Sequence, residues 1–240
     1  MNIAILLGRH NSKSVKGKNV YNFFGKPAFT YPLRAALKCK NISKIYVSTD
    51  SPEIIKYSKK LKCEIIYRPK KLCSDEALLE DAIQHAVNVC YKENQKISNF
   101  VILLCNSICL SSQELKRGFE LIKQKKTDSV TTVSRFNMFS PVRAKKINKN
   151  YLETYIPNKT MSKYTDLSCD RDKSTDSFFC TGSFTISKAK ILKNLKQNPM
   201  PFRWIGKKTK FIEQDQCVGD IDFEWQIPSI KWWLKKNKLA

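Results

Sequence analysis

The feature that most constrains the fold of this chain is the alternation of strand-like and helix-like segments between residues 3 and 133. Short apolar runs that end in polar turn residues, such as 3–7 and 100–104, predict buried strands. Amphipathic segments with helical spacing lie between these runs. Because helices that connect parallel strands cover both faces of the sheet, the pattern predicts an α/β fold with three layers and a mostly parallel sheet.

The individual elements follow from the same patterns. Strands are expected at 3–7, 42–47, 64–67, 100–104, 129–133, 178–186 and 210–213. Helices are expected at 27–40, from Pro52 onward, and at 75–92, 112–126, 187–195 and 225–234. Pro32 favours a break or a late start in the first helix, and Ser74 is the predicted N-cap of the third.

The regular alternation ends near residue 135. Residues 135–178 are polar, and so long a stretch inside a compact domain indicates an insertion with a function of its own. The chain is therefore predicted to form one domain, residues 1–240, that carries an insertion at 135–178.

Composition argues against several classes of protein. No apolar stretch approaches the roughly 20 residues of a membrane span, and a strand that begins by residue 3 is not expected to follow a signal peptide. The nine cysteines form no C-x-x-C pair, so a zinc ribbon is not expected. We expect reduced thiols and a cytoplasmic protein.

The chain is strongly basic, with 44 Lys and Arg against 21 Asp and Glu and a net charge of +23. One interpretation is an anionic partner, either nucleic acid or a phosphorylated substrate. The other is a lysine-rich surface that is simply solvated. No arginine-rich or aromatic-interleaved block stands out, which favours the second interpretation and argues against nucleic acid.

A basic loop follows the first predicted strand and carries Arg9, Lys13, Lys16 and Lys18. Open α/β sheets bind ligands at the carboxyl ends of their strands, and backbone N–H groups together with cations can hold a polyphosphate. The loop matches neither the Walker A motif nor G-x-G-x-x-G. A solvated basic turn therefore stays open as the alternative.

Polar residues elsewhere could complete such a site. Asp220 and Asp222 would point the same way in an extended segment, which suits Mg²⁺; alternatively, Asp222 caps the last helix. Residues 48–50 could contact a nucleotide or cap the helix from Pro52. Arg68 follows the third strand and could meet a phosphate or a base.

Taken together, these segments resemble the acylneuraminate (CMP-sialic acid) synthetases, a family of nonulosonate cytidylyltransferases. The family's first motif, A-R-x-x-S-K-G-x-x-x-K-N, is matched at Arg9, Ser12, Lys13, Lys18 and Asn19. Further matches follow in the family's order: V-S-T-D at 47–50, R-P at 68–69, S-D at 74–75, H-A at 85–86, D-S-V at 128–130 and D-I-D at 220–222.

The resemblance implies a role for each matched residue. Lys18, with Arg9, would neutralise charge on the α-phosphate or the leaving pyrophosphate, and Asp220 and Asp222 would bind Mg²⁺. The residues that would bind the nucleotide are Arg9, Ser12, Lys13, Asn19, Arg68 and Ser74. The family also implies a Rossmann-like nucleotidyltransferase sheet and a homodimer in which the insertion reaches the partner subunit.

The segments that would face the sugar depart from the family. Its Q-P-T-S-P-L-R segment is replaced by C-N-S-I-C-L-S at 105–111, and its R-P-N-G-A-I-Y segment by F-C-T-G-S-F-T at 179–185. We therefore expect an acceptor other than ordinary N-acetylneuraminate. The candidate contacts for the sugar acid are Asn106, Ser107, Arg143 and Arg171.

The resemblance implies that CTP reacts with a 2-keto sugar acid to give a CMP-sugar and pyrophosphate, with Mg²⁺ as the cofactor. Two alternatives stay open. The first is a basic α/β protein that binds nucleic acid, and the second is a nucleotide-binding relative that has lost sugar activation.

Overall fold

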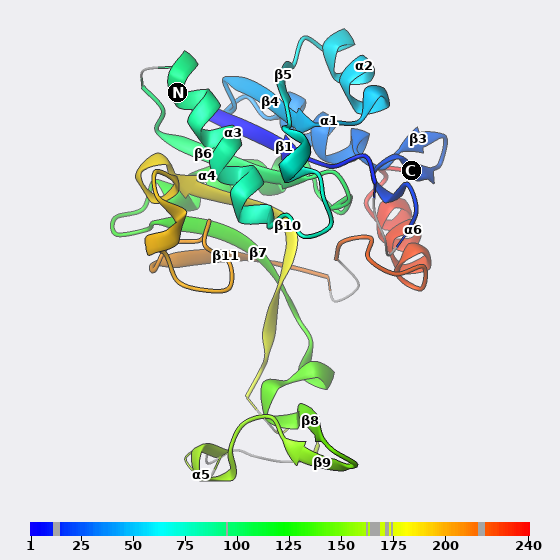
Figure 1. The fold of residues 1–240 in the computed structure, drawn as a ribbon, viewed down its shortest axis with the longest axis vertical. Coiled ribbons are helices and arrows are strands. Elements are labelled where there is room, and N and C mark those ends of the chain that lie inside the picture. Colours follow the sequence, from blue (N-terminus) through cyan, green and yellow to red (C-terminus); the bar gives the residue numbers. More distant parts are fainter. Residues whose placement is uncertain are drawn as a thin grey trace.

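The computed structural model describes residues 1–11, 15–94, 96–161, 163, 169–170, 173, 175–215 and 219–240. Its centre is a seven-stranded sheet in the order β11-β7-β10-β6-β1-β4-β5 (Figure 1). The strands are β1 (Asn2–Leu7), β4 (Lys44–Thr49), β5 (Glu64–Tyr67), β6 (Asn99–Leu104), β7 (Ser129–Arg135), β10 (Phe178–Lys188) and β11 (Thr209–Gln214). All pairings are parallel except the two made by β10, so the sheet is mostly parallel, as predicted.

Helices cover both faces of this sheet. The apolar sides of α1 (Thr30–Lys38), α2 (Pro52–Lys60) and α4 (Ser112–Ile122) pack on one face. The helix α3 (Leu79–Glu93) packs on the other, with the 3-10 turns that follow β10. The three-layer α/β fold predicted from the alternating pattern is thereby confirmed.

A third apolar cluster lies beside the sheet. It joins the helix α6 (Gln226–Lys236) to α1 and to the small hairpin of β2 (Asn22–Phe23) and β3 (Lys26–Pro27). Ile221 is fully buried in this cluster. Its burial fixes the place of the two aspartates on either side of it.

Three sequence predictions about the helices have clear outcomes. The first helix does start late, at Thr30, so that Pro32 lies in the first turn, where a missing N–H costs no helical hydrogen bond. Ser74 is not the N-cap of α3, which is Leu78. The prediction failed because residues 74 and 75 contact the basic loop instead of the helix.

The predicted helix at 187–195 is wrong. The strand β10 continues to Lys188 because Ser187 and Lys188 still pair with β6. Two separate 3-10 turns follow, at Ala189–Leu192 and Leu195–Gln197.

The polar segment 135–178 projects from the body as an arm (Figure 1). The paired ends of β7 and β10 form its stem, where Arg135 lies opposite Phe178. The arm contains the hairpin of β8 (Lys145–Asn148) and β9 (Tyr151–Thr154) and the short helix α5 (Asn158–Met161). Its large apolar side chains are exposed: Ile147, Tyr151, Leu152 and Tyr155.

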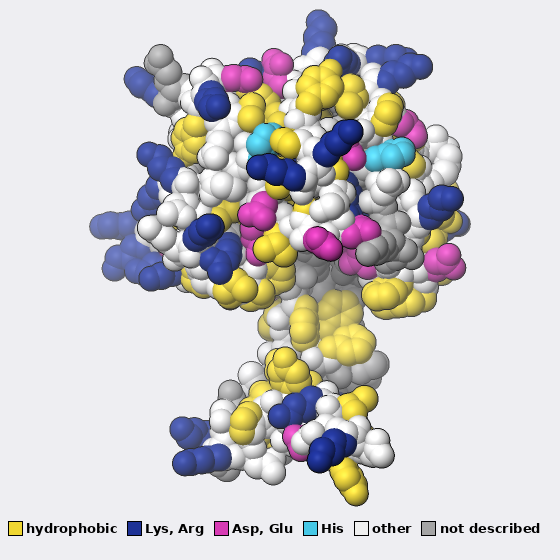
Figure 2. Space-filling model, viewed as in Figure 1, with side chains coloured by type: hydrophobic (Ala, Val, Ile, Leu, Met, Phe, Trp, Pro, Cys, Tyr) yellow, Lys and Arg dark blue, Asp and Glu magenta, His cyan; other side chains and the backbone are white. Residues whose placement is uncertain are grey.

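Figure 2 shows a narrow neck between body and arm, with hydrophobic side chains gathered around it. Lysine and arginine side chains are scattered over the visible face of both parts and form no continuous stripe there. No helix in the described part of the chain is long and apolar enough to cross a membrane. The cysteines of the described residues are free thiols, and Cys217 lies outside them.

Candidate functional site

A cleft of about 270 Å³ opens where the carboxyl ends of β1 and β6 meet the start of α3. Its polar lining comes from four separate segments of the chain. The polar residues are Arg9, Lys18, Asn19, Arg68, Asn106, Asp220 and Asp222. The parallel pairing of β1 with β6 brings the ends of these strands together, as expected for a ligand site in an open α/β sheet.

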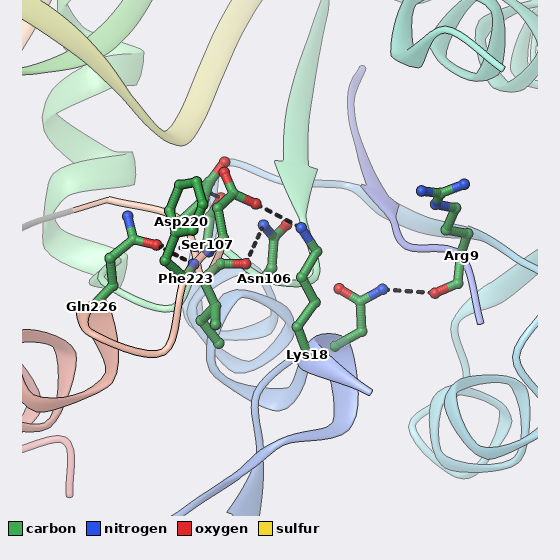
Figure 3. Close-up of polar contacts among 10 residues, drawn as sticks. Arg9, Lys18, Asn106, Ser107, Asp220, Phe223 and Gln226 are labelled. Atoms are coloured by element: carbon green, nitrogen blue, oxygen red, sulfur yellow. Dashed lines mark hydrogen bonds and ion pairs between the residues drawn. The ribbon is translucent and has the colours of Figure 1, made fainter. Parts of the chain in front are cut away.

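The basic loop meets the acidic pair through Lys18. Its Nζ lies 2.6 Å from Oδ1 of Asp222, and the two side chains are 18% and 48% exposed. In Figure 3, Lys18 points toward Asp220 and Asn106, and Arg9 lies on its opposite side. Asp222 does not cap the last helix, because α6 begins only at Gln226. The capping alternative for Asp222 is therefore excluded.

Asp220 is half-buried, and Ser107 Oγ donates a hydrogen bond to its carboxylate. The pKa of Asp220 is raised to about 6, mainly because burial disfavours the ionised form; the nearby Asp222 also raises it, while the Ser107 hydrogen bond and the Lys18 ammonium lower it. The segment is held from both ends: Ile221 N donates to Asn106 O at 3.2 Å, and the Asp222 N–H donates to Gln226 Oε1 at 2.7 Å. The Asp220 carboxylate therefore has a fixed position.

Arg9 and Asn19 organise the loop itself. Arg9 forms an ion pair with Asp75 at 2.8 Å and donates to the carbonyl of Ser74, also at 2.8 Å. Asn19 Nδ2 donates to the carbonyl of Arg9 at 2.7 Å. The S-D pair thus anchors Arg9, which explains why it does not cap a helix. Asp50 likewise accepts a hydrogen bond from the His10 N–H, and Ser51 caps α2.

Arg68 is a buried cation at the back of the cleft, 9% exposed. Its guanidinium donates to Ser48, to the carbonyl at 2.8 Å and to Oγ at 3.4 Å. Burial lowers its pKa, and the thiols of Cys73 and Cys105 and the Asp50 carboxylate act in the opposite direction. A cation held this firmly under the cleft contributes fixed positive charge to it.

Gly8 sits where the loop leaves β1, and its N–H donates to the carbonyl of Ser48 at 3.2 Å. A Cβ added to Gly8 would overlap Cys105 Sγ and lie 2.7 Å from Cys105 Cβ. Such close approach brings the start of the loop directly against the end of β6. A larger residue at position 8 would push these two segments apart.

We expect Gly8→Ala to lower the free energy of unfolding by about 1–3 kcal/mol, because overpacking a filled site costs about that much. Cys105→Gly removes both atoms that lie too close to the new Cβ, so the double variant should regain most of the stability that Gly8→Ala loses when it is compared with Cys105→Gly alone. Urea denaturation of the four proteins measures this coupling. Additive effects of the two substitutions would contradict the close contact.

A second compartment, of about 510 Å³, adjoins the cleft. The two share four lining residues, Leu79, Leu104, Asp220 and Asp222, so the acidic pair stands at their junction. The rest of the second lining includes six aromatic side chains: Phe136, Phe139, Phe179, Phe202, Trp204 and Trp225. None of the described residues lining it is a lysine or arginine.

Most of the predicted site residues converge. The cleft brings together Arg9, Lys18, Asn19, Arg68, Asn106, Asp220 and Asp222, and Ser107 and Ser74 support it. Arg143, a candidate sugar contact, is exposed at the start of the arm and lines neither compartment. Ser12, Lys13 and Arg171 lie outside the described residues.

The aromatic compartment and Gln226 escaped the sequence predictions. The rings come from the arm stem, from β10, from 202–204 and from the start of α6, so no local spacing links them. Gln226 is the first residue of α6 and follows Asp222 by four residues. The one sequence signal for the aromatic compartment was the segment 179–185, which contains Phe179 and departs from the family pattern.

Comparison with known proteins assigns the family. The family model described as "Cytidylyltransferase" matches residues 3–164. The chain belongs to the cytidylyltransferase family. The match covers β1, the basic loop and β6, and it ends within the arm.

Two relatives of this cytidylyltransferase show how far the similarity extends. A bifunctional pseudaminic acid cytidylyltransferase and hydrolase from Helicobacter pylori is 34% identical over 59% of this chain and 27% of its own length. An N-acylneuraminate cytidylyltransferase from Escherichia coli is 26% identical over 65% of this chain and 40% of its own length. The chain thus spans well under two thirds of either relative.

Solved structures agree on the fold. The structure of CMP:2-keto-3-deoxy-manno-octonic acid synthetase complexed with CTP aligns with a TM-score of 0.65, covering 98% of this chain and 99% of the other. The two are 13% identical, so this likeness concerns the fold of the cytidylyltransferase alone.

Proposed function

We propose that this cytidylyltransferase transfers CMP from CTP to a nonulosonic acid and releases pyrophosphate. One observation carries the proposal: Asp220 and Asp222 stand at the junction of a cation-lined cleft and an aromatic compartment. A reaction between a nucleoside triphosphate and a second substrate needs two adjoining sites of different chemistry. The pseudaminic and sialic acid relatives support the choice of acceptor.

The nucleotide is assigned to the cation-lined cleft. Arg9, Lys18 and Arg68 supply positive charge for the phosphates, and the buried Asn19 keeps the loop in place. Ser12 and Lys13 are assigned to the phosphates on the sequence motif alone.

We assign Mg²⁺ to Asp220 and Asp222, whose hard carboxylate oxygens suit this ion. Among the described residues, no three or more His, Cys, Asp or Glu side chains gather into a metal site. An ion held by only two carboxylates keeps places for water and phosphate, as is usual for Mg²⁺ beside nucleotides. When bound, the ion offsets part of the negative charge of the triphosphate.

In the proposed reaction, the anomeric hydroxyl of the acid attacks the α-phosphorus of CTP. The bond to the bridging oxygen of pyrophosphate breaks, and the hydroxyl proton is released. Catalysis consists mainly of placing the two substrates in line and offsetting charge. Lys18 provides that offset from the chain itself, because its ammonium faces the junction.

The acceptor is assigned to the aromatic compartment. Sugar faces that carry C–H and acyl groups pack well on aromatic rings, whereas hydroxyls lose hydration there. We therefore infer a nonulosonic acid with acylamido or deoxy positions at the end remote from the carboxylate. The carboxylate faces the junction, where Lys18 lies.

We also propose a homodimer formed through the arm and a cytoplasmic location, where CTP is made. The exposed apolar residues of the arm hairpin support the dimer, since a patch of this kind marks an interaction surface.

Pyrophosphate release tests the function. We expect release when CTP, Mg²⁺ and an acid from the sialic, pseudaminic, legionaminic or deoxy-octulosonic series are combined, and little release with ATP, GTP or UTP. Within a matched pair, 9-deoxy-N-acetylneuraminic acid should give a kcat/KM about 10–100-fold above that of N-acetylneuraminic acid.

Other outcomes would identify the alternatives. CTP binding without turnover of any acid would favour a relative that has lost sugar activation. Binding of unrelated oligonucleotides at about 0.15 M salt with a steep salt dependence, and no binding of CTP, would favour a nucleic-acid protein.

A further inference from the structure

The strand β10 contains a bulge directly beneath Asp220. Its pairing with β7 changes register between Cys180 and Thr185, and Gly182 within this stretch has φ +74°. A Cβ at Gly182 would lie 2.9 Å from both carboxylate oxygens of Asp220. The backbone of the bulge therefore lies directly against the Asp220 carboxylate.

Gln214, the last residue of β11, holds the bulge from the side. Its Oε1 accepts hydrogen bonds from Thr181 Oγ1 at 2.7 Å and Ser183 Oγ at 3.0 Å, the residues on either side of Gly182. Gln214 is buried, with 8% of its surface exposed, so these hydrogen bonds do not compete with bulk water. One amide oxygen thus holds both neighbours of Gly182, Thr181 and Ser183.

The other end of the amide is fixed as well. Gln214 Nε2 donates to Glu114 Oε1 at 2.6 Å and to the carbonyl of Cys109 at 3.1 Å. The second oxygen of Glu114 accepts from Ser111 in the capping box of α4. A carboxylate and a carbonyl only accept, so the amide nitrogen must face them and the oxygen must face the hydroxyls.

We propose that Gln214 is a positioning residue that holds the Gly182 bulge against Asp220 and thereby sets the affinity of the site for a divalent cation. The inference rests on the proposed function, which assigns the metal to Asp220 and Asp222. Gln214 touches neither metal nor substrate. It acts through a rigid path from α4, through the amide, to the strand under the carboxylate.

The test measures Mn²⁺ binding in the presence of CTP by electron paramagnetic resonance. We expect Gln214→Leu, which lacks both hydrogen-bonding groups, to weaken Mn²⁺ about 10–100-fold, as removal of a supporting partner does at other metal sites. The KM for CTP at saturating metal should stay within about 3-fold of wild type, since Gln214 does not line the cleft.

A matched control separates this effect from general destabilisation. Ser129→Ala removes a buried hydroxyl at the far end of β7, where Ser129 Oγ accepts from the Gly206 N–H and lies 2.6 Å from Thr209 Oγ1. We expect wild-type Mn²⁺ affinity in this variant. Equal weakening in both variants would overturn the proposal.

A rescue experiment covers the case in which Gln214→Leu does not fold. Gln214→Glu places two carboxylates together and should weaken Mn²⁺ strongly. Adding Glu114→Gln exchanges donor and acceptor and restores the pair between residues 114 and 214, while the carbonyl of Cys109 still lacks its donor, so the double variant should recover part of the affinity. No recovery, or Gln214→Leu binding Mn²⁺ as wild type does, overturns the positioning role. If the wild-type protein binds no Mn²⁺·CTP, the proposed function fails and this inference with it.

Discussion

Asp220→Asn should lower the rate of CTP-dependent pyrophosphate release roughly a thousand-fold. It should also make the metal-free protein more stable. The first effect follows because an amide is a poor substitute for a carboxylate ligand, and a metal contributes several kcal/mol to such a reaction. The second follows from burial. The pKa of Asp220 is raised to about 6, so its ionised form is disfavoured in the folded state.

The sign of the stability change depends on pH. Because the folded pKa lies above the unfolded value near 4, the native carboxylate costs stability fully above about pH 6 and nothing below about pH 4. Asn carries no charge to bury. We expect the substitution to raise the free energy of unfolding by about 1–3 kcal/mol at pH 7.5 and by nearly nothing at pH 4.

Urea denaturation in the presence of EDTA at the two pH values measures this difference. Asp222→Asn is the matched comparison, because Asp222 is half-exposed and should lose activity without gaining stability. Asp215→Asn, which removes a surface ion pair with Lys236, should change neither. An active Asp220→Asn variant would rule out the proposed metal site.

The elements that were predicted correctly are those that depend on residues close together in the sequence. Apolar runs such as 3–7 and 100–104 became central strands because each run encodes its own burial. The cation-lined part of the cleft was predictable for a similar reason, since Arg9, Lys18 and Asn19 lie in one loop. Asp220 and Asp222 were predictable as a pair because one residue separates them.

The parts that failed depend on long-range contacts. Gln214 supports Asp220 only because β10 enters the sheet antiparallel between β6 and β7 and places Thr181 and Ser183 beside it. No pattern of residues near Gln214 in the sequence predicts this role. The hydrogen bond from Ser107 to Asp220 was likewise not predicted, and the sugar contact proposed for Ser107 stays a prediction. Helix 187–195 failed because strand pairing overrode the local pattern.

Lys18→Ala should lower kcat by several hundred-fold with the fold intact. A cation about 4 Å from a phosphate oxygen is worth about 4 kcal/mol at an effective dielectric of 20, which corresponds to almost a thousand-fold in rate. The 18% exposure of the Lys18 side chain reduces the effect somewhat through solvent screening. The surface variant Lys56→Ala should keep wild-type turnover, and near-wild-type turnover in Lys18→Ala would refute the assignment.

The ion pair with Asp222 leaves a second way for Lys18 to act, namely by holding that carboxylate in place. The two roles differ in what they predict for metal binding. If Lys18 stabilises charge on the phosphates, Lys18→Ala lowers kcat while Mn²⁺ affinity, measured without CTP, stays level or rises, because a competing cation is gone. If Lys18 only orients Asp222, Mn²⁺ affinity falls, and Lys18→Ala adds no further loss of rate in an Asp222→Asn background. We expect the first pattern, because Gln226 Oε1 accepts a hydrogen bond from the backbone N–H of Asp222 at 2.7 Å and thereby keeps the residue beside the cleft without Lys18.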